Sequence, residues 1–147
     1  MSRTATTRRA TVQSIAVVVA AVFTLVGVAG FIPGLTTNYD QLMVAGHESG
    51  AMLLGLFAVS VFHNIVHLAF GVVGFLMSRT VNGAHWYLIG GGLVYLVLFV
   101  YGLVVDHGSE ANFVPVNPAD NWLHLLLGVG MLGLGLAAGR GHAARRR

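Results

Sequence analysis

The chain has 147 residues, of which 56% are hydrophobic and only 9% are charged. A soluble domain carries about 25% charged residues, so this composition excludes an ordinary soluble core and indicates a polytopic membrane protein. The absence of cysteine excludes disulfides, cysteine-ligated zinc and iron–sulfur clusters. The formal net charge is +3, but the arginines stand in short flanks, which is typical of a topology signal and does not predict nucleic-acid binding.

Four apolar stretches are predicted to form one membrane domain over residues 12–139. They run over residues 12–32, 51–77, 86–105 and 118–139, between a basic N-terminal tail (residues 1–11) and a basic C-terminal tail (residues 140–147). Each stretch is long enough to cross about 30 Å of hydrocarbon at 1.5 Å per residue. Pro33 and its neighbouring glycines end the first stretch, and Asn82-Gly83 is a turn signal before the third. Asn117 and Pro118 predict the N-cap and first residue of the last helix.

The charged residues separate between the two sides of this topology. All eight arginines fall in the two tails or in the loop before the third stretch. The five acids fall in or beside the other two loops: Asp40, Glu48, Asp106, Glu110 and Asp120. The positive-inside rule therefore predicts that both termini lie in the cytoplasm, and we expect the protein to lie in the bacterial plasma (inner) membrane. The expected partners are the lipid bilayer and, in addition, another membrane protein or a second copy of the chain.

One face of the second stretch carries only polar and small residues. They recur at helical spacing: Ser60, Asn64, His67, Gly71, Gly74 and Ser78, with His63 beside them. Polar groups inside a membrane are costly and usually face protein, and small residues let helices approach closely. The pattern predicts an all-α, four-helix membrane bundle with a polar interior face.

The fourth stretch repeats this face. The pattern Asn-x-x-His-Leu-x-x-Gly-Val begins at Asn64 and again at Asn121. Both helices run from the outside to the inside, as in a parallel repeat of helix pairs. The first and third stretches do not align at the same offset, so a duplicated helix pair and an unrelated similarity both remain open.

Four separated segments together resemble a known family. They cover residues 30–34 (GFIPG), 37–40 (TNYD), 62–68 (FHNIVHL) and 120–125 (DNWLHL). The chain resembles, over about residues 16–139, an uncharacterised family of small four-span bacterial membrane proteins, grouped as a domain of unknown function and common in GC-rich bacteria. The resemblance implies a four-helix membrane protein and brings no established activity, cofactor or catalytic residue.

The candidate interior cluster consists of His63, Asn64, His67, Tyr95, Asp120, Asn121 and His124. We place His63 near mid-bilayer, His67 about 6 Å deeper, and His124 nearer the outer surface. The interpretation that we favour is structural and non-enzymatic, without a cofactor. The histidines would be neutral and bonded to the asparagines, Ser60, Tyr95 or backbone carbonyls, each bond contributing about 0.6–2 kcal/mol.

Two functional alternatives remain for this cluster. One is a haem- or divalent-metal-binding subunit, because neutral imidazole is the commonest metal ligand and His63 and His67 are four residues apart on one helix. His124 would then be the second haem ligand. The other alternative is a small proton, ion or solute pathway past the interior histidines and asparagines. There is no H-E-x-x-H pattern, no nucleophile elbow and no phosphate-binding glycine loop, so hydrolase chemistry is not indicated.

A second candidate cluster lies in the outer loops. It contains acids and histidines from both loops: Asp40, His47, Glu48, Asp106, His107 and Glu110. These loops are too polar to enter lipid. We expect them, with Tyr39, to fold against each other as a cap.

Overall fold

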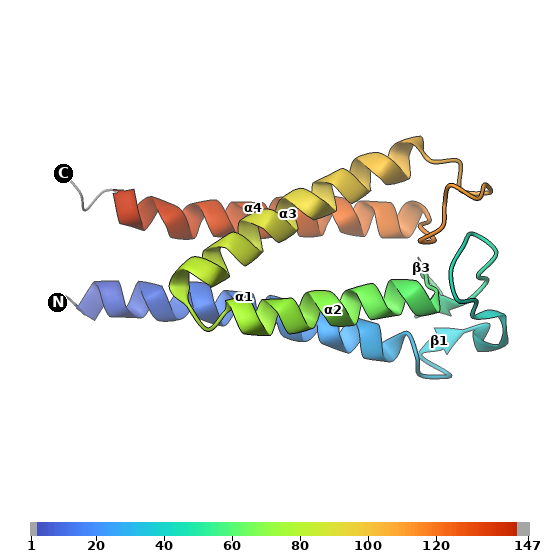
Figure 1. The fold of residues 1–147 in the computed structure, drawn as a ribbon, viewed down its shortest axis with the longest axis horizontal. Helices are drawn as coiled ribbons and strands as arrows, with labels where there is room; N and C mark the ends of the chain where they lie inside the picture. The colour runs from blue at the N-terminus through green and yellow to red at the C-terminus, as the bar shows by residue number, and fades with distance from the viewer. Residues whose placement is uncertain (1–2, 144–147) are drawn as a thin grey trace.

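The structure is a computed structural model that describes the backbone of residues 3–143 and the side chains of residues 11–138. It contains α1 (Arg3–Ala29), α2 (Val61–Met77), α3 (Val81–Val104) and α4 (Pro118–Ala143). Figure 1 shows two helix hairpins, α1 with α2 and α3 with α4, and α3 runs obliquely from the first hairpin to the far end of the second. The predicted all-α bundle is confirmed, with one small sheet added.

The first and last helices extend further towards the termini than predicted. α1 begins at Arg3 and α4 continues to Ala143, so most of the expected N-terminal tail and half of the expected C-terminal tail are helical. Alanine and arginine are good helix formers and no proline or glycine interrupts residues 3–11, so polarity alone was a poor guide to the helix end. The rest of the two predicted tails, residues 1–2 and 144–147, lies outside the described residues.

The second predicted span begins ten residues too early. Residues 51–60 instead contain two strands, β2 (Met52–Leu53) and β3 (Phe57–Ala58). With β1 (Thr36–Thr37) they form an antiparallel sheet in the order β1-β2-β3. Leu54 and Gly55 both have positive φ where β2 turns into β3. Short apolar runs do not distinguish strand from helix by periodicity, which is why the sequence was misread here. A 3-10 turn, η1 (Tyr39–Gln41), precedes β2.

Three side-chain caps fix where the helices begin. Ser60 accepts a hydrogen bond from the His63 N–H (3.1 Å) and starts α2. Thr80 accepts one from the Gly83 N–H (3.0 Å) and starts α3, so the predicted Asn82-Gly83 turn is wrong and these residues form the first helical turn. At α4 the predicted Asn117 cap is confirmed, because its Oδ1 accepts from the Asp120 N–H (2.9 Å).

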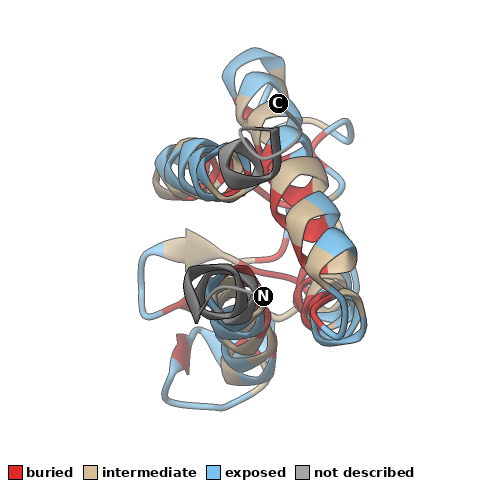
Figure 2. Cartoon of the chain, turned by 90° about the vertical axis from the view of Figure 1, so that its left-hand side faces the viewer, coloured by how far each residue is buried: buried red, intermediate tan, exposed pale blue. Residues whose placement is uncertain are grey.

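Three helices have the length and composition of membrane spans: residues 11–29 of α1, all of α3, and residues 118–138 of α4. α2 has 17 residues and is about 26 Å long, slightly less than the hydrocarbon thickness. Exposed residues lie on the outward faces of the helices and buried ones where the helices meet (Figure 2). The start of α1 and the end of α4 lie at one end of the molecule, and the two long connections lie at the other, which we call the capped end (Figure 1).

Candidate functional site

Six polar residues of α2 and α4, together with Tyr95 of α3, form the polar layer. The six are His63, Asn64 and His67 on α2 and Asp120, Asn121 and His124 on α4. Every one of them is buried, with exposed fractions between 1% and 7%. All seven side chains are therefore enclosed by the helices.

The position predicted for His63 within its helix is wrong. Because α2 begins at Val61, His63 lies in its first turn, near the capped end, and not near the middle of the span. His67 is the seventh residue of α2 and His124 is the seventh residue of α4. The two imidazoles therefore occupy equivalent positions in their helices, counted from the first helical residue.

His63 and His67 contact each other directly. Their Nε2 atoms are 2.9 Å apart, and their rings lie 4.8 Å apart between centroids at an interplanar angle of 20°. At least one ring is neutral and accepts, since one Nε2 must offer a lone pair to the other. His124 lies near enough to both for their charges to interact.

The rest of the expected hydrogen bonding is not found. The Nδ1 atoms of His63, His67 and His124 are buried without a hydrogen-bond partner, and so are Nδ2 of Asn64 and Oδ1 of Asn121. Buried polar groups normally have partners, and each exception calls for an explanation. Five of the six orphaned side-chain atoms among the described residues belong to the polar layer.

Each asparagine amide of the polar layer occupies the space beside a glycine that a larger side chain would fill. The Asn64 amide packs against Gly30, directly after α1, and the Asn121 amide packs against Gly102 on α3. A Cβ at either glycine would overlap the amide. The predicted role of glycine in close helix approach is confirmed, and each asparagine serves as a register contact within its own hairpin.

Aromatic rings join the two hairpins at this level. Phe23 of α1 stacks on Tyr95 of α3, with ring centroids 5.3 Å apart and an interplanar angle of 20°. Phe23 also lies 5.7 Å from the His67 ring, and Tyr95 lies 5.4 Å from the His124 ring. Each imidazole is thus flanked by the aromatic ring of its neighbouring helix.

Similar contacts occur in the two hairpins, whereas a duplicated helix pair stays an open interpretation. α2 overlays α4 at the sequence offset that pairs Asn64 with Asn121, and α1 overlays α3 at a different offset that pairs Phe23 with Tyr95. The second offset also aligns Gly30 with Gly102. The Asn64–Gly30 contact therefore corresponds to the Asn121–Gly102 contact in the other hairpin. The connections differ in length, which explains why one offset does not align both helices.

Among the polar-layer residues of α2 and α4, the two helices differ at one position. The residue four before the shared histidine is His63 on α2 and Asp120 on α4. The Asp120 carboxylate takes part in two hydrogen bonds that stabilise the fold. Its Oδ2 accepts from the Asn117 N–H (3.0 Å) and from the Ala58 N–H of β3 (2.9 Å). It completes a capping box and ties α4 to the sheet.

The predicted outer-loop cluster is not assembled as a group of side chains. Asp40, Glu48, Asp106 and Glu110 are exposed, whereas His47 and His107 are half-buried. No described hydrogen bond or ion pair joins any two of these six. His107 Nε2 instead contacts the Gly102 carbonyl (3.1 Å), and Asp106 accepts from the Gly108 N–H.

The two loops nevertheless meet through their backbones. The Gly46 N–H donates to the Phe113 carbonyl (2.6 Å), and the Asn117 side chain donates to the Leu56 carbonyl (2.8 Å). Asn112, 2% exposed, organises the second loop by bonding to His107 and Val116. Sequence reasoning missed Asn112, although an asparagine in a short loop is a common turn-former.

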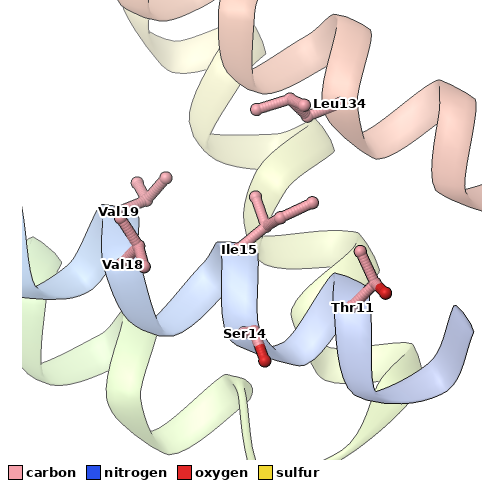
Figure 3. Close-up of a pocket in the computed structure, with 6 residues that line it drawn as sticks. All are labelled: Thr11, Ser14, Ile15, Val18, Val19 and Leu134. Atoms are coloured by element: carbon pink, nitrogen blue, oxygen red, sulfur yellow. The ribbon is translucent and has the colours of Figure 1, made fainter. Parts of the chain in front are cut away.

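Within the described side chains, no three His, Asp or Glu residues are placed to share a metal ion. An open recess lies between α1 and α4, away from the polar layer (Figure 3). Its lining is mainly aliphatic: Thr11, Ser14, Ile15, Val18, Val19 and Leu134. It carries no acid or base, so it does not offer catalytic chemistry.

The comparisons with known proteins place the chain in one family. A family model described as a domain of unknown function, DUF4383, matches residues 13–137. The match covers all of the polar layer and both loops of the capped end. Comparisons with curated proteins and with solved structures gave no match.

Proposed function

This chain belongs to the DUF4383 family, and we propose that it is a non-enzymatic, four-span integral protein of a bacterial plasma membrane. Both termini lie in the cytoplasm and the capped end faces outward. The observation that carries the proposal is the distribution of apolar surface: valines and leucines line the outward faces of helices long enough to span a bilayer.

α2 serves as the fourth span in this proposal. It runs beside α1, so it crosses the same layer of the molecule, and the sheet lies at its outer end. A span slightly shorter than the hydrocarbon is accommodated at modest cost by local thinning of the bilayer. The acids at the capped end and Arg79 at the opposite end support the orientation.

The proposed role of the polar layer is to hold the two hairpins in one register. Two asparagine–glycine contacts act within the hairpins, and the Phe23–Tyr95 stack acts between them. Packing and interhelical polar contacts are the forces that assemble membrane helices, because lipid is as apolar as the helix surfaces.

The arrangement does not favour the haem alternative. A haem between His67 and His124 would need its macrocycle between the two imidazoles. Phe23 and Tyr95 lie against these rings and stack on each other. Their side chains fill the space beside both imidazoles that a macrocycle would use.

Reporter fusions test the membrane topology. Fusions after Arg79 and after Arg147 should report a cytoplasmic location, because these positions carry the basic flanks. Fusions beside Asp40 and Glu110 should report the outer side. A reproducible outer signal after Arg79 would contradict the four-span topology.

A further inference from the structure

We propose that His63 and His67 form a two-point chelate for a divalent transition-metal ion of the copper or nickel type. Residues at positions i and i+4 lie on the same face of a helix, so their side chains can converge on one ion. Here the two Nε2 atoms already lie 2.9 Å apart and share one hydrogen bond. An ion binds both once the shared proton moves to Nδ1 of the ring that carries it, so that each Nε2 offers a lone pair. Neutral imidazole nitrogen is a good ligand for both metals.

The separation of the two nitrogens selects among coordination geometries. Metal–imidazole bonds are about 2.05 Å long, so a tetrahedral site holds neighbouring nitrogens about 3.3 Å apart. A square-planar or octahedral site holds them about 2.9 Å apart, because its ligand angle is about 90°. The observed 2.9 Å is a hydrogen-bond distance, and it is also compatible with adjacent ligands of a tetragonal site, which copper(II) and nickel(II) prefer.

The surroundings leave the imidazole pair available for a ligand. Neither Nδ1 atom has a hydrogen-bond partner, so no second hydrogen bond fixes either ring in one tautomer. The neighbouring asparagine is turned away towards Gly30. The two rings share one hydrogen bond with each other, and the backbone of Ala58 and of Pro115 lies within bonding range of His63.

The pair lies at the accessible end of the bundle. His63 is in the first turn of α2 and lies close to the backbone of Ala58, in β3, and of Pro115, in the second loop. An ion from the outer side would pass these two segments to reach it. Water or small anions complete the coordination, because no described third protein ligand converges on the pair.

His124 provides a control from within the same chain. It occupies the position equivalent to His67, equally buried, but its partner four residues earlier is Asp120 and not a histidine. Replacing His124 removes one buried imidazole of the same layer without touching the chelating pair. Glutamine is the replacement of choice, since it keeps a polar side chain of similar size.

The experiment uses the full chain, purified in mild detergent, stripped with a chelator and titrated with copper(II). The expected result is one copper per chain, with an axial paramagnetic resonance spectrum showing splitting by two imidazole nitrogens. H63Q and H67Q should each weaken copper binding more than about tenfold and remove this splitting. H124Q and H85Q should keep both the copper affinity and the splitting of the unmodified chain.

Helical circular dichroism and a single elution peak verify that each variant is folded. Absence of stoichiometric copper in the unmodified chain would overturn the proposal, and so would binding that survives in both H63Q and H67Q. Equal loss in folded H124Q would overturn the assignment to this pair. A variant that fails to fold is replaced by H63N or H67N, for which the same losses are expected.

Discussion

At the scale of single residues, the two glycines that receive the asparagine amides leave no room for a side chain. Gly102 lies inside α3 against Asn121, so a methyl group there would force the amide away. We expect Gly102→Ala to lower the free energy of unfolding by about 1–3 kcal/mol, the usual cost of overpacking. The measurement is denaturant unfolding in mixed micelles, followed by circular dichroism.

Gly90 on the same helix supplies the matched control. A Cβ at Gly90 meets no atom within 4 Å, so Gly90→Ala should only gain helix propensity and stabilise the fold by up to about 1 kcal/mol. Equal effects of the two substitutions would show that the asparagine–glycine contact does not determine the register.

The histidines show which features of the polar layer could be predicted from the sequence and which could not. Burial of His67 and His124 followed from the stripe of small residues, because position on a helix face depends only on spacing. The location of His63 in the first turn of α2, and the equivalent helix positions of His67 and His124, depended on where α2 begins. The sequence contained that signal in Ser60, a good N-cap, but the apolar run before it concealed the helix start.

At the scale of elements, Asp120 links the start of α4 to the sheet. Asp120→Ala removes the acceptor of the Asn117 and Ala58 N–H groups. We expect a loss of about 1–2 kcal/mol in stability, as for other helix caps. Hydrogen exchange should show faster exchange of the Ala58 amide, which the carboxylate protects.

Glu110→Ala is the control for this substitution. Glu110 is an exposed acid of the neighbouring loop without a described hydrogen bond, so its removal should leave the Ala58 amide protected. Asp120→Asn should fall between the two, since one amide oxygen can still accept. Unchanged exchange at Ala58 in Asp120→Ala would contradict the proposed tie between β3 and α4.

The elements also show why the fold class was easier to predict than its parts. The all-α bundle follows from the apolar composition and from helical spacing, both of which extend over many residues. The sheet involves pairs such as Thr36 with Leu53 and Leu53 with Phe57, which depend on contacts between segments. Local patterns cannot reveal such pairings, and the strands have only two residues each.

At the scale of the whole molecule, the two hairpins are joined by aromatic rings, and this makes the Phe23–Tyr95 stack the contact to test. Offset aromatic pairs contribute about 0.5–1.5 kcal/mol beyond their burial. A double-mutant cycle with Phe23→Ala and Tyr95→Ala should give a coupling energy in this range. The control is a cycle of Phe23→Ala with Trp86→Ala, because Trp86 is an exposed residue near the start of α3. Its coupling energy should not exceed about 0.5 kcal/mol. Tyr95→Phe should keep the coupling, because the ring and not the hydroxyl makes the stack; a coupling near zero for Phe23 and Tyr95 would mean that other contacts hold the halves together.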